Sequence, residues 1–297
     1  MITFVVKYAI FCKSINIKLK SNRLSSPPSK VKDKNTIIEP FLSFMFSAGR
    51  IITILSVPIL LGSSRSTGEV IDKIVPISRS FKQMLSDVRE QVITPDSAQR
   101  QFVAIGALLR SNFPADSVQC QLDTSMVFPL RGLSKRAIGG NGTAIGYRPK
   151  GFNLFDNTVR GSHPAHDLFI HDMNDDSQDD YTQRPVDVLA MTGGVIIATE
   201  TNWDTASVFR GGNYVWLYDP CRQGLFYFAH NKVVSVQQGE LVRAGDKLGE
   251  VGRTGFNAYK RRSHTHLHLM YLKIQPDGLP TPQNTFTWLI NAKQTSE

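Results

Sequence analysis

The chain has 297 residues, of which 41% are hydrophobic and 20% charged, and this length leaves room for a sizeable core and more than one structural unit. Its formal net charge is +9. Residues 1–64 hold nine Lys or Arg against two acidic residues, so the remaining chain is close to neutral. The basic balance is therefore no argument for a nucleic-acid partner, and none is expected.

Residues 1–44 show no recognisable fold signal. They mix lysines with scattered apolar residues and include the run Ser25-Ser26-Pro27-Pro28. We expect them to be a non-native upstream extension or disordered, with translation starting at Met45. A native protein whose sequenced N-terminus lies within residues 1–44 would contradict this hypothesis.

Residues 45–64 have the pattern of a signal peptide. Arg50 precedes an apolar run of 12 residues, Ile51–Gly62, and Ser63-Ser64 follow it. The run is short for a membrane span and typical of a signal-peptide core, with an uncleaved anchor as the alternative. It predicts export to the periplasm, the cell envelope or the extracellular space, with membrane contact only through this segment.

Residues 65–120 are predicted to form a helical N-terminal region. From Val70 to about Phe113 apolar residues recur at helical intervals, and Pro95-Asp96 interrupts them. The pattern predicts a hairpin of two amphipathic helices, with Thr94 to Ser97 capping the second. Two roles are open for this hairpin: packing on the following domain, or a lid that regulates it.

Cysteine is sparse in this chain. Cys12 falls in the expected extension, which leaves Cys120 and Cys221. In an exported protein these two can pair or remain free thiols. Neither has a Cys-x-x-Cys neighbour, so metal binding by thiolates is not expected.

The C-terminal half is predicted to be antiparallel β. Segments rich in β-branched and aromatic residues are bounded by Gly or Asp and show no helical period. Short, closely spaced strands favour a mainly β fold, a sandwich or barrel-like sheet with a metal on its face. The predicted strand segments are 193–199, 213–218, 225–230 and 241–249, the last with a turn at Gly245-Asp246.

The histidines are confined to one part of the chain. All seven lie between His163 and His268. His266 and His268 are two residues apart on a predicted strand, so they share a face. Imidazole and carboxylate are ligands that Zn²⁺ prefers, and a catalytic zinc uses three protein ligands. One Asp and two His would suffice, whereas an isolated His-x-His is as often simply solvated.

An acidic run, Asp172–Asp180, follows the first histidines. Carboxylates at this density can hold Ca²⁺. The run lacks the Gly at position six and the Glu at position twelve of an EF-hand loop. We expect a solvated surface loop.

Four motifs follow one another along the C-terminal half: His163-x-x-x-Asp167, Tyr227-Phe228-Ala229-His230, the segment Gly249–Gly255, and His266-Leu267-His268. In this order they resemble the motifs of the lysostaphin/LytM-type zinc metallopeptidases, peptidoglycan endopeptidases with a duplicated-hybrid-motif β fold. The resemblance covers about residues 125–275 and implies a catalytic domain at 121–275, with 276–297 as a C-terminal tail. The helical signature His-Glu-x-x-His of thermolysin-like enzymes is absent.

The resemblance also implies roles for individual residues. His163, Asp167 and His268 would hold Zn²⁺, with the zinc-bound water as nucleophile. His266 would act as general base, and His230 would stabilise the oxyanion or orient the water.

The other histidines have no implied ligand role. His166 should point away from the metal because it neighbours Asp167 on an extended segment. We expect structural roles for His166 and His171. His264 shares the strand face of His266 and either contacts substrate or is solvated.

The resemblance implies a zinc metalloendopeptidase that hydrolyses peptide cross-links or stem peptides of peptidoglycan. One alternative is a LytM-like binding module that has lost catalysis and activates other wall hydrolases. The presence of all five site residues weakens that alternative. Another is a peptidase that acts on exported proteins with the same metal chemistry.

Overall fold

The computed structural model describes residues 67–114, 126–142 and 146–296, all within one compact unit. The expected extension, 1–44, and the expected signal segment, 45–64, lie outside the described residues. Cys120 also lies outside them, and Cys221 is disulfide-bonded. None of the described helices has the length and apolar character needed to cross a membrane.

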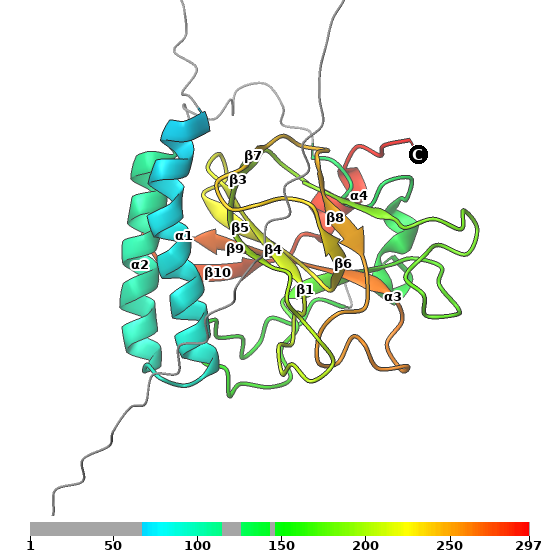
Figure 1. Cartoon of the computed structure of the whole chain (residues 1–297), viewed down its shortest axis with the longest axis horizontal. Coiled ribbons are helices and arrows are strands. Elements are labelled where there is room, and N and C mark those ends of the chain that lie inside the picture. Colours follow the sequence, from blue (N-terminus) through cyan, green and yellow to red (C-terminus); the bar gives the residue numbers. More distant parts are fainter. Residues whose placement is uncertain (1–66, 115–125, 143–145, 297) are drawn as a thin grey trace, which may run out of the picture. The chain divides into compact units, whose positions relative to one another are not determined.

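Two helices open the described part and lie side by side (Figure 1). Helix α1 spans Thr67–Arg89 and α2 spans Pro95–Asn112. Thr94 caps α2 by accepting a hydrogen bond from the backbone N–H of Ser97 at 3.3 Å, and Pro95 occupies the first turn, where no backbone donor is needed. The predicted helical hairpin is confirmed.

The domain that follows is mainly antiparallel β, as predicted. Its larger sheet has seven strands in the order β1-β9-β5-β4-β3-β7, with β10 paired to β9; a second sheet has the order β2-β8-β6. Short helical turns, η1 (Lys135–Ala137) and α3 (Gly139–Gly142), precede β1. The strands are β1 (Ala165–Phe169), β2 (Asp187–Leu189), β3 (Gly194–Glu200), β4 (Tyr214–Asp219), β5 (Gly224–Ala229), β6 (Asn231–Val234), β7 (Leu241–Val242), β8 (Lys247–Val251), β9 (His266–Ile274) and β10 (Pro280–Gln283).

The larger sheet has a different cover on each face. On one face, Leu267, Leu269 and Tyr271 of β9 are buried in a core shared with the smaller sheet. On the other, Met270, Leu272 and Ile274 are buried in a core shared with α1 and α2. Because successive side chains of a β-strand point to opposite faces, β9 contributes to both cores.

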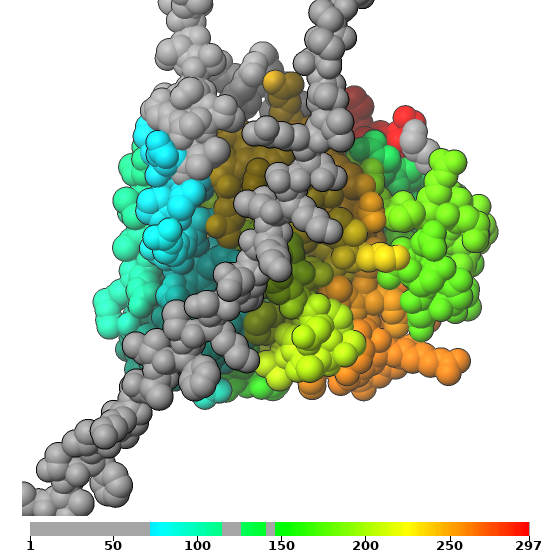
Figure 2. Space-filling view, viewed as in Figure 1, coloured from blue at the N-terminus to red at the C-terminus, as the bar shows by residue number. Residues whose placement is uncertain are grey.

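Helices α1 and α2 cover only one end of the sheet face on which they pack. Phe81 of α1 meets Trp216 of β4 edge to face, with ring centroids 5.5 Å apart, and Lys82 donates to the Thr199 carbonyl at 2.7 Å. His266 and His268 share this face with Met270, Leu272 and Ile274 but lie at its other end. Figure 2 shows the helices at one end of the unit and the loops around residues 170–185 and 255–262 at the other. In the described residues the hairpin packs on the domain, and none of the hydrogen bonds, ion pairs or ring contacts of the two imidazoles involves it.

The segment expected as a C-terminal tail, 276–297, contributes to the fold through a strand and a helix within its described residues. Strand β10 pairs with β9, and α4 (Phe286–Asn291) packs on the core shared by the two sheets. Trp288 meets Tyr271 edge to face at 4.9 Å between ring centroids. The sequence prediction stopped at 275 because the resemblance did, whereas apolar side chains continue to bury surface beyond it.

Candidate metal centre and active site

Three predicted ligands come together at the start of β1 and β9. The pairing of these strands sets Asp167 opposite His268, and His163 lies just before β1. Asp167 Oδ2 is 3.2 Å from His163 Nε2, and Asp167 Oδ1 is 3.0 Å from His268 Nδ1. One ligand atom from each residue lies within 4.8 Å of the others. Two imidazoles and a carboxylate form a donor set that suits Zn²⁺.

The ring of His163 is oriented by the backbone. Its Nδ1 lies 2.8 Å from the Gly146 carbonyl, so Nδ1–H donates there and Nε2 faces Asp167. The backbone of Arg148 pairs with that of His163 through two N–H to O=C bonds of 2.7 Å. A ligand whose second nitrogen is fixed in this way presents a defined tautomer to a metal.

The electrostatics of this cluster favour a cation. Burial alone would raise the pKa of Asp167, but hydrogen bonds from His163 and His268 outweigh it and hold that pKa well below its ordinary value. Burial lowers the pKa of His163, yet the hydrogen bond and charge of Asp167 outweigh this and raise it. The ionised carboxylate of Asp167 thus attracts positive charge to the space between His163 and His268, where a proton or a metal ion can bind.

Two further histidines stand beside the cluster. The ring centroid of His230 is 4.9 Å from that of His266 and 5.5 Å from that of His268. His266 Nε2 lies 3.7 Å from Asp167 Oδ1. All five predicted site residues are therefore brought together.

The tautomers of His230 and His266 follow from their carbonyl partners. Nδ1 of His230 lies 2.7 Å from the Thr254 carbonyl, and Nδ1 of His266 lies 2.6 Å from the His264 carbonyl. Each Nδ1–H donates, which leaves Nε2 with a free lone pair. Burial lowers the pKa of both rings, and the pKa of His230 falls further because His266 and His268 are close. Both imidazoles are therefore neutral proton acceptors near pH 7.

The backbone of His230 adopts an unusual conformation. Its φ is 69°, in the left-handed region that non-glycine residues rarely occupy, directly after β5 ends. Its N–H donates to the Gly211 carbonyl at 2.9 Å, which holds the turn. Gly255 packs against the ring, because a Cβ there would lie 2.9 Å from His230 Nδ1. The glycine of the third motif thus leaves room for an imidazole.

Sequence reasoning missed the groups that hold the imidazoles. These are the backbone carbonyls of Gly146, Thr254 and His264. Thr254 lies within the Gly249–Gly255 motif, so the motif was the available signal. Gly146 and His264 act through main-chain oxygens, which no side-chain pattern reveals.

The remaining histidines lie outside the cluster. His166 is buried, with Nε2 2.9 Å from Asn284 Oδ1 and its ring stacked on Tyr147. His171 Nδ1 lies 3.1 Å from Asp180 Oδ2. His264 is exposed.

The acidic loop differs from the expected solvated loop. Asp172 is only 3% exposed, and its Oδ2 accepts hydrogen bonds from Thr265 Oγ1 at 2.5 Å and from the Ser177 backbone at 2.8 Å. Asp175 pairs with Arg253 at 2.6 Å. Because Thr265 directly precedes His266, the loop fixes the start of β9, a role that charge density alone did not indicate.

Comparison with known proteins supports this description. Residues 179–278 match Peptidase family M23, a region that includes His230, His266 and His268. No curated protein matches the chain.

Several solved structures are similar to parts of the chain. The catalytic domain of the antimicrobial peptidase lysostaphin from Staphylococcus simulans is 24% identical over 48% of this chain and 86% of its own, with a TM-score of 0.32. A Ruminococcus gnavus protein named lytM is 16% identical over 76% of this chain and 92% of its own, with a TM-score of 0.38. A zinc-containing peptidase from Vibrio cholerae is 17% identical over 57% of this chain, with a TM-score of 0.32, and the chain spans only 40% of its length.

The matched residues and the ordered motifs confirm the resemblance found in the sequence. Residues 179–278 of the β domain thus match Peptidase family M23, and the ordered motifs of the chain resemble those of the lysostaphin/LytM type.

Proposed function

We propose that the chain is a zinc-dependent metalloendopeptidase that hydrolyses peptide bonds in the cross-links or stem peptides of peptidoglycan. One observation carries the proposal. His163, Asp167 and His268 offer three ligand atoms within 4.8 Å of one another, and two neutral imidazoles stand beside them. The family match supports the peptidase activity.

His163, Asp167 and His268 would hold the zinc ion. Zinc in such a site supplies Lewis-acid chemistry, which activates a water nucleophile and polarises the scissile carbonyl group. The chain would contribute three ligands, the number that catalytic zinc sites use.

His266 is the general base in this proposal. Its ring is neutral because burial lowers its pKa, and Nδ1–H is committed to the His264 carbonyl. Nε2, 3.7 Å from Asp167 Oδ1, is then free to accept a proton from the attacking water and to pass it to the leaving amine.

His230 orients the water. Its pKa lies well below the ordinary value, and its Nδ1–H is committed to the Thr254 carbonyl, so Nε2 acts as an acceptor. A neutral ring in this tautomer has no second N–H for an oxyanion. Of the two roles that the sequence left open, the geometry supports orientation.

Export through the 45–64 segment is part of the proposal, as is the division into a helical region at 65–120 and a catalytic domain at 121–275. The disulfide at Cys221 supports export, because disulfides persist in oxidising compartments. We propose Cys120 as its partner. N-terminal sequencing of the native protein and peptide mapping without reductant test these points.

The central experiment uses the full chain. Zinc is measured by elemental analysis, and new amino groups are measured after incubation with purified peptidoglycan and, separately, with casein. About one zinc per chain with amines released from peptidoglycan supports the proposal. His171→Ala, which removes a histidine outside the cluster, should leave both readouts unchanged.

Other outcomes would contradict the proposal. Zinc with cleavage of casein alone would favour a peptidase of exported proteins. A chain that binds peptidoglycan without zinc or cleavage would favour the binding module.

A further inference from the structure

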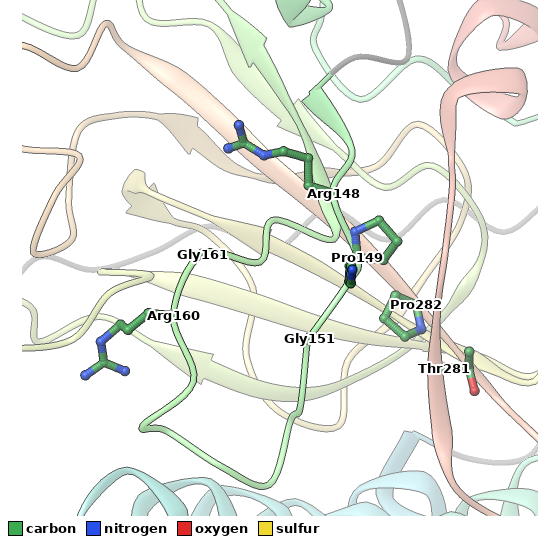
Figure 3. A pocket seen from close by; sticks show the side chains of 8 residues that line it. Arg148, Pro149, Gly151, Arg160, Gly161, Thr281 and Pro282 are labelled. Atoms are coloured by element: carbon green, nitrogen blue, oxygen red, sulfur yellow. The ribbon is translucent and has the colours of Figure 1, made fainter.

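An open pocket of about 990 Å³ lies beside the loop that leads to His163. Its charged lining is entirely basic: Arg148, Lys150 and Arg160, with neutral glycines, prolines and Thr281 around them. Figure 3 shows the two arginines on the two limbs of one loop, which runs from Arg148 through Gly151 and returns through Gly161. We name these three basic residues the cationic pocket.

The charges of the cationic pocket are not neutralised within the described residues. Arg148, Lys150 and Arg160 are exposed, and no ion pair of the described part joins any of them to a carboxylate. Asp156 is close enough for the charge of Arg160 to help lower its pKa, but its carboxylate accepts hydrogen bonds from Thr158. The pocket therefore presents free positive charge to solvent.

A second guanidinium crowds that of Arg160. Arg160 donates to the carbonyls of Asn157 and Val159, and Arg210 donates to the same two oxygens at 3.1 and 3.3 Å. The charge of Arg160 contributes to lowering the pKa of Arg210, after burial. Arg210 does not line the pocket, so it adds to the positive potential around Arg160 without itself contacting a ligand there.

The cationic pocket adjoins the candidate metal centre along the chain. Arg148 pairs with His163 through two backbone hydrogen bonds of 2.7 Å, and Arg160 precedes His163 by three residues. Because Arg148 lies directly opposite His163 in this backbone pair, one residue of the pocket is next to a candidate zinc ligand.

The wall of the pocket leaves space for that group. Gly151 and Gly161 have φ of 80° and 84°, and a Cβ added to either would meet nothing within 4 Å. These glycines turn the loop in a conformation that other residues rarely adopt. No side chain at either position fills the opening.

We propose that the cationic pocket binds a carboxylate of the peptide substrate close to the scissile bond, so that the enzyme selects acidic stem peptides over amidated ones. Guanidinium forks match carboxylates in geometry and charge. The inference rests on the proposed peptidase function, because it names the substrate class of that site. It assigns specificity to Arg148 and Arg160, with Lys150 as a supporting charge.

The test compares a soluble cross-linked peptide dimer from peptidoglycan with the same dimer after amidation of its carboxylates. Binding is measured with the zinc-loaded full chain carrying His266→Ala, and hydrolysis with the unaltered chain. We expect the acidic dimer to bind about 10- to 100-fold more tightly, and its KM to be lower by a similar factor with kcat little changed.

The variant Arg148→Gln/Arg160→Gln should treat the two dimers alike and retain its zinc. Arg148→Lys/Arg160→Lys should recover part of the preference, because charge is kept while the fork is lost. Arg243→Gln is the matched control, since Arg243 is an exposed cation next to β7, at the opposite edge of the sheet from β1. It should keep the full preference.

Three results would overturn the inference. They are equal binding of the two dimers by the unaltered site, a preference that survives in the double Gln variant, and competition by inorganic phosphate as strong as that by the acidic dimer. Failure of the peptidase function looks different. In that case neither dimer is hydrolysed, while a preference in binding for the acidic dimer would still support the cationic pocket.

Discussion

One face of the larger sheet has two halves with opposite properties. Along β9, Met270, Leu272 and Ile274 are at most 5% exposed and lie under the helical hairpin. On the same face, His266 and His268 continue the row beyond the hairpin and lie next to Asp167 of the neighbouring strand β1. A single strand with one alternating pattern thus carries a hydrophobic core at one end and a metal centre at the other.

The two halves are held by different means. The covered half depends on apolar packing, which is non-directional and contributes mainly to stability. The histidine half depends on backbone carbonyls that orient the rings of His163, His230 and His266, on Asp167, which orients His268, and on the loop Asp172–Asp180. Mutations in the two halves should therefore separate stability from metal binding and catalysis.

The largest effect is expected for His268→Ala. It removes one of three candidate ligands and leaves Asp167 without one of its two hydrogen-bond partners. Zinc and hydrolysis should be lost together, which elemental analysis and amine release measure. The change should not unfold the chain, because His268 is only partly buried. A His268→Ala protein that keeps stoichiometric zinc would show that the ligand set is different.

The second effect separates metal from turnover within the histidine half. His266→Ala should keep zinc and lower kcat by about 10²- to 10⁴-fold, the usual contribution of a general base. Zinc content and kcat are measured on the same preparation. Loss of zinc in His266→Ala, with zinc retained in His268→Ala, would reverse the two assignments.

The third prediction concerns the covered half. Leu272 is fully buried under the helices, so Leu272→Ala should lower the free energy of unfolding by about 2–5 kcal/mol through lost burial and the cavity left behind. Zinc content per folded chain should stay unchanged. Ile290→Ala, at a position 39% exposed, is the control and should change stability little. Zinc loss in folded Leu272→Ala would mean that the two halves are coupled.

The fourth effect is a pH dependence confined to the histidine half. Asp167 raises the pKa of His163 above its ordinary value, and a metal must displace the proton that His163 then holds. Zinc affinity should be highest above that pKa and fall about tenfold per pH unit below it for each proton released, while Asp167 stays ionised. Titration against a chelator at several pH values measures it, with His171→Ala expected to show the same slope. An affinity that is flat from pH 8 to 6 would contradict the role of His163.

The sequence predicted the two halves unequally well. The helical hairpin and the strand segments came from local sequence patterns, and the five candidate site residues came from motifs. The pairing of strands was not predicted: the two strands expected within 241–249 belong to different sheets, β7 to the larger and β8 to the smaller. The carbonyls of Gly146 and His264, the anchoring of Asp172 on Thr265, and the packing of residues 276–297 were missed. These features depend on contacts between distant segments. Periodicity reports which face a side chain takes, but not which backbone atom of another segment will meet it.

The smallest effect is expected at the helix cap of α2, which takes no part in the candidate metal centre. Thr94→Ala removes the side-chain acceptor for the Ser97 N–H at the start of α2 and should lower the free energy of unfolding by about 1 kcal/mol. Thr94→Ser keeps the hydroxyl and should restore most of that loss, as chemical denaturation would show. Zinc content and kcat should be unchanged in both variants, because the hairpin packs on the apolar half of the face. A fall in kcat that Thr94→Ser does not restore would instead indicate that the helices act on the site as a lid.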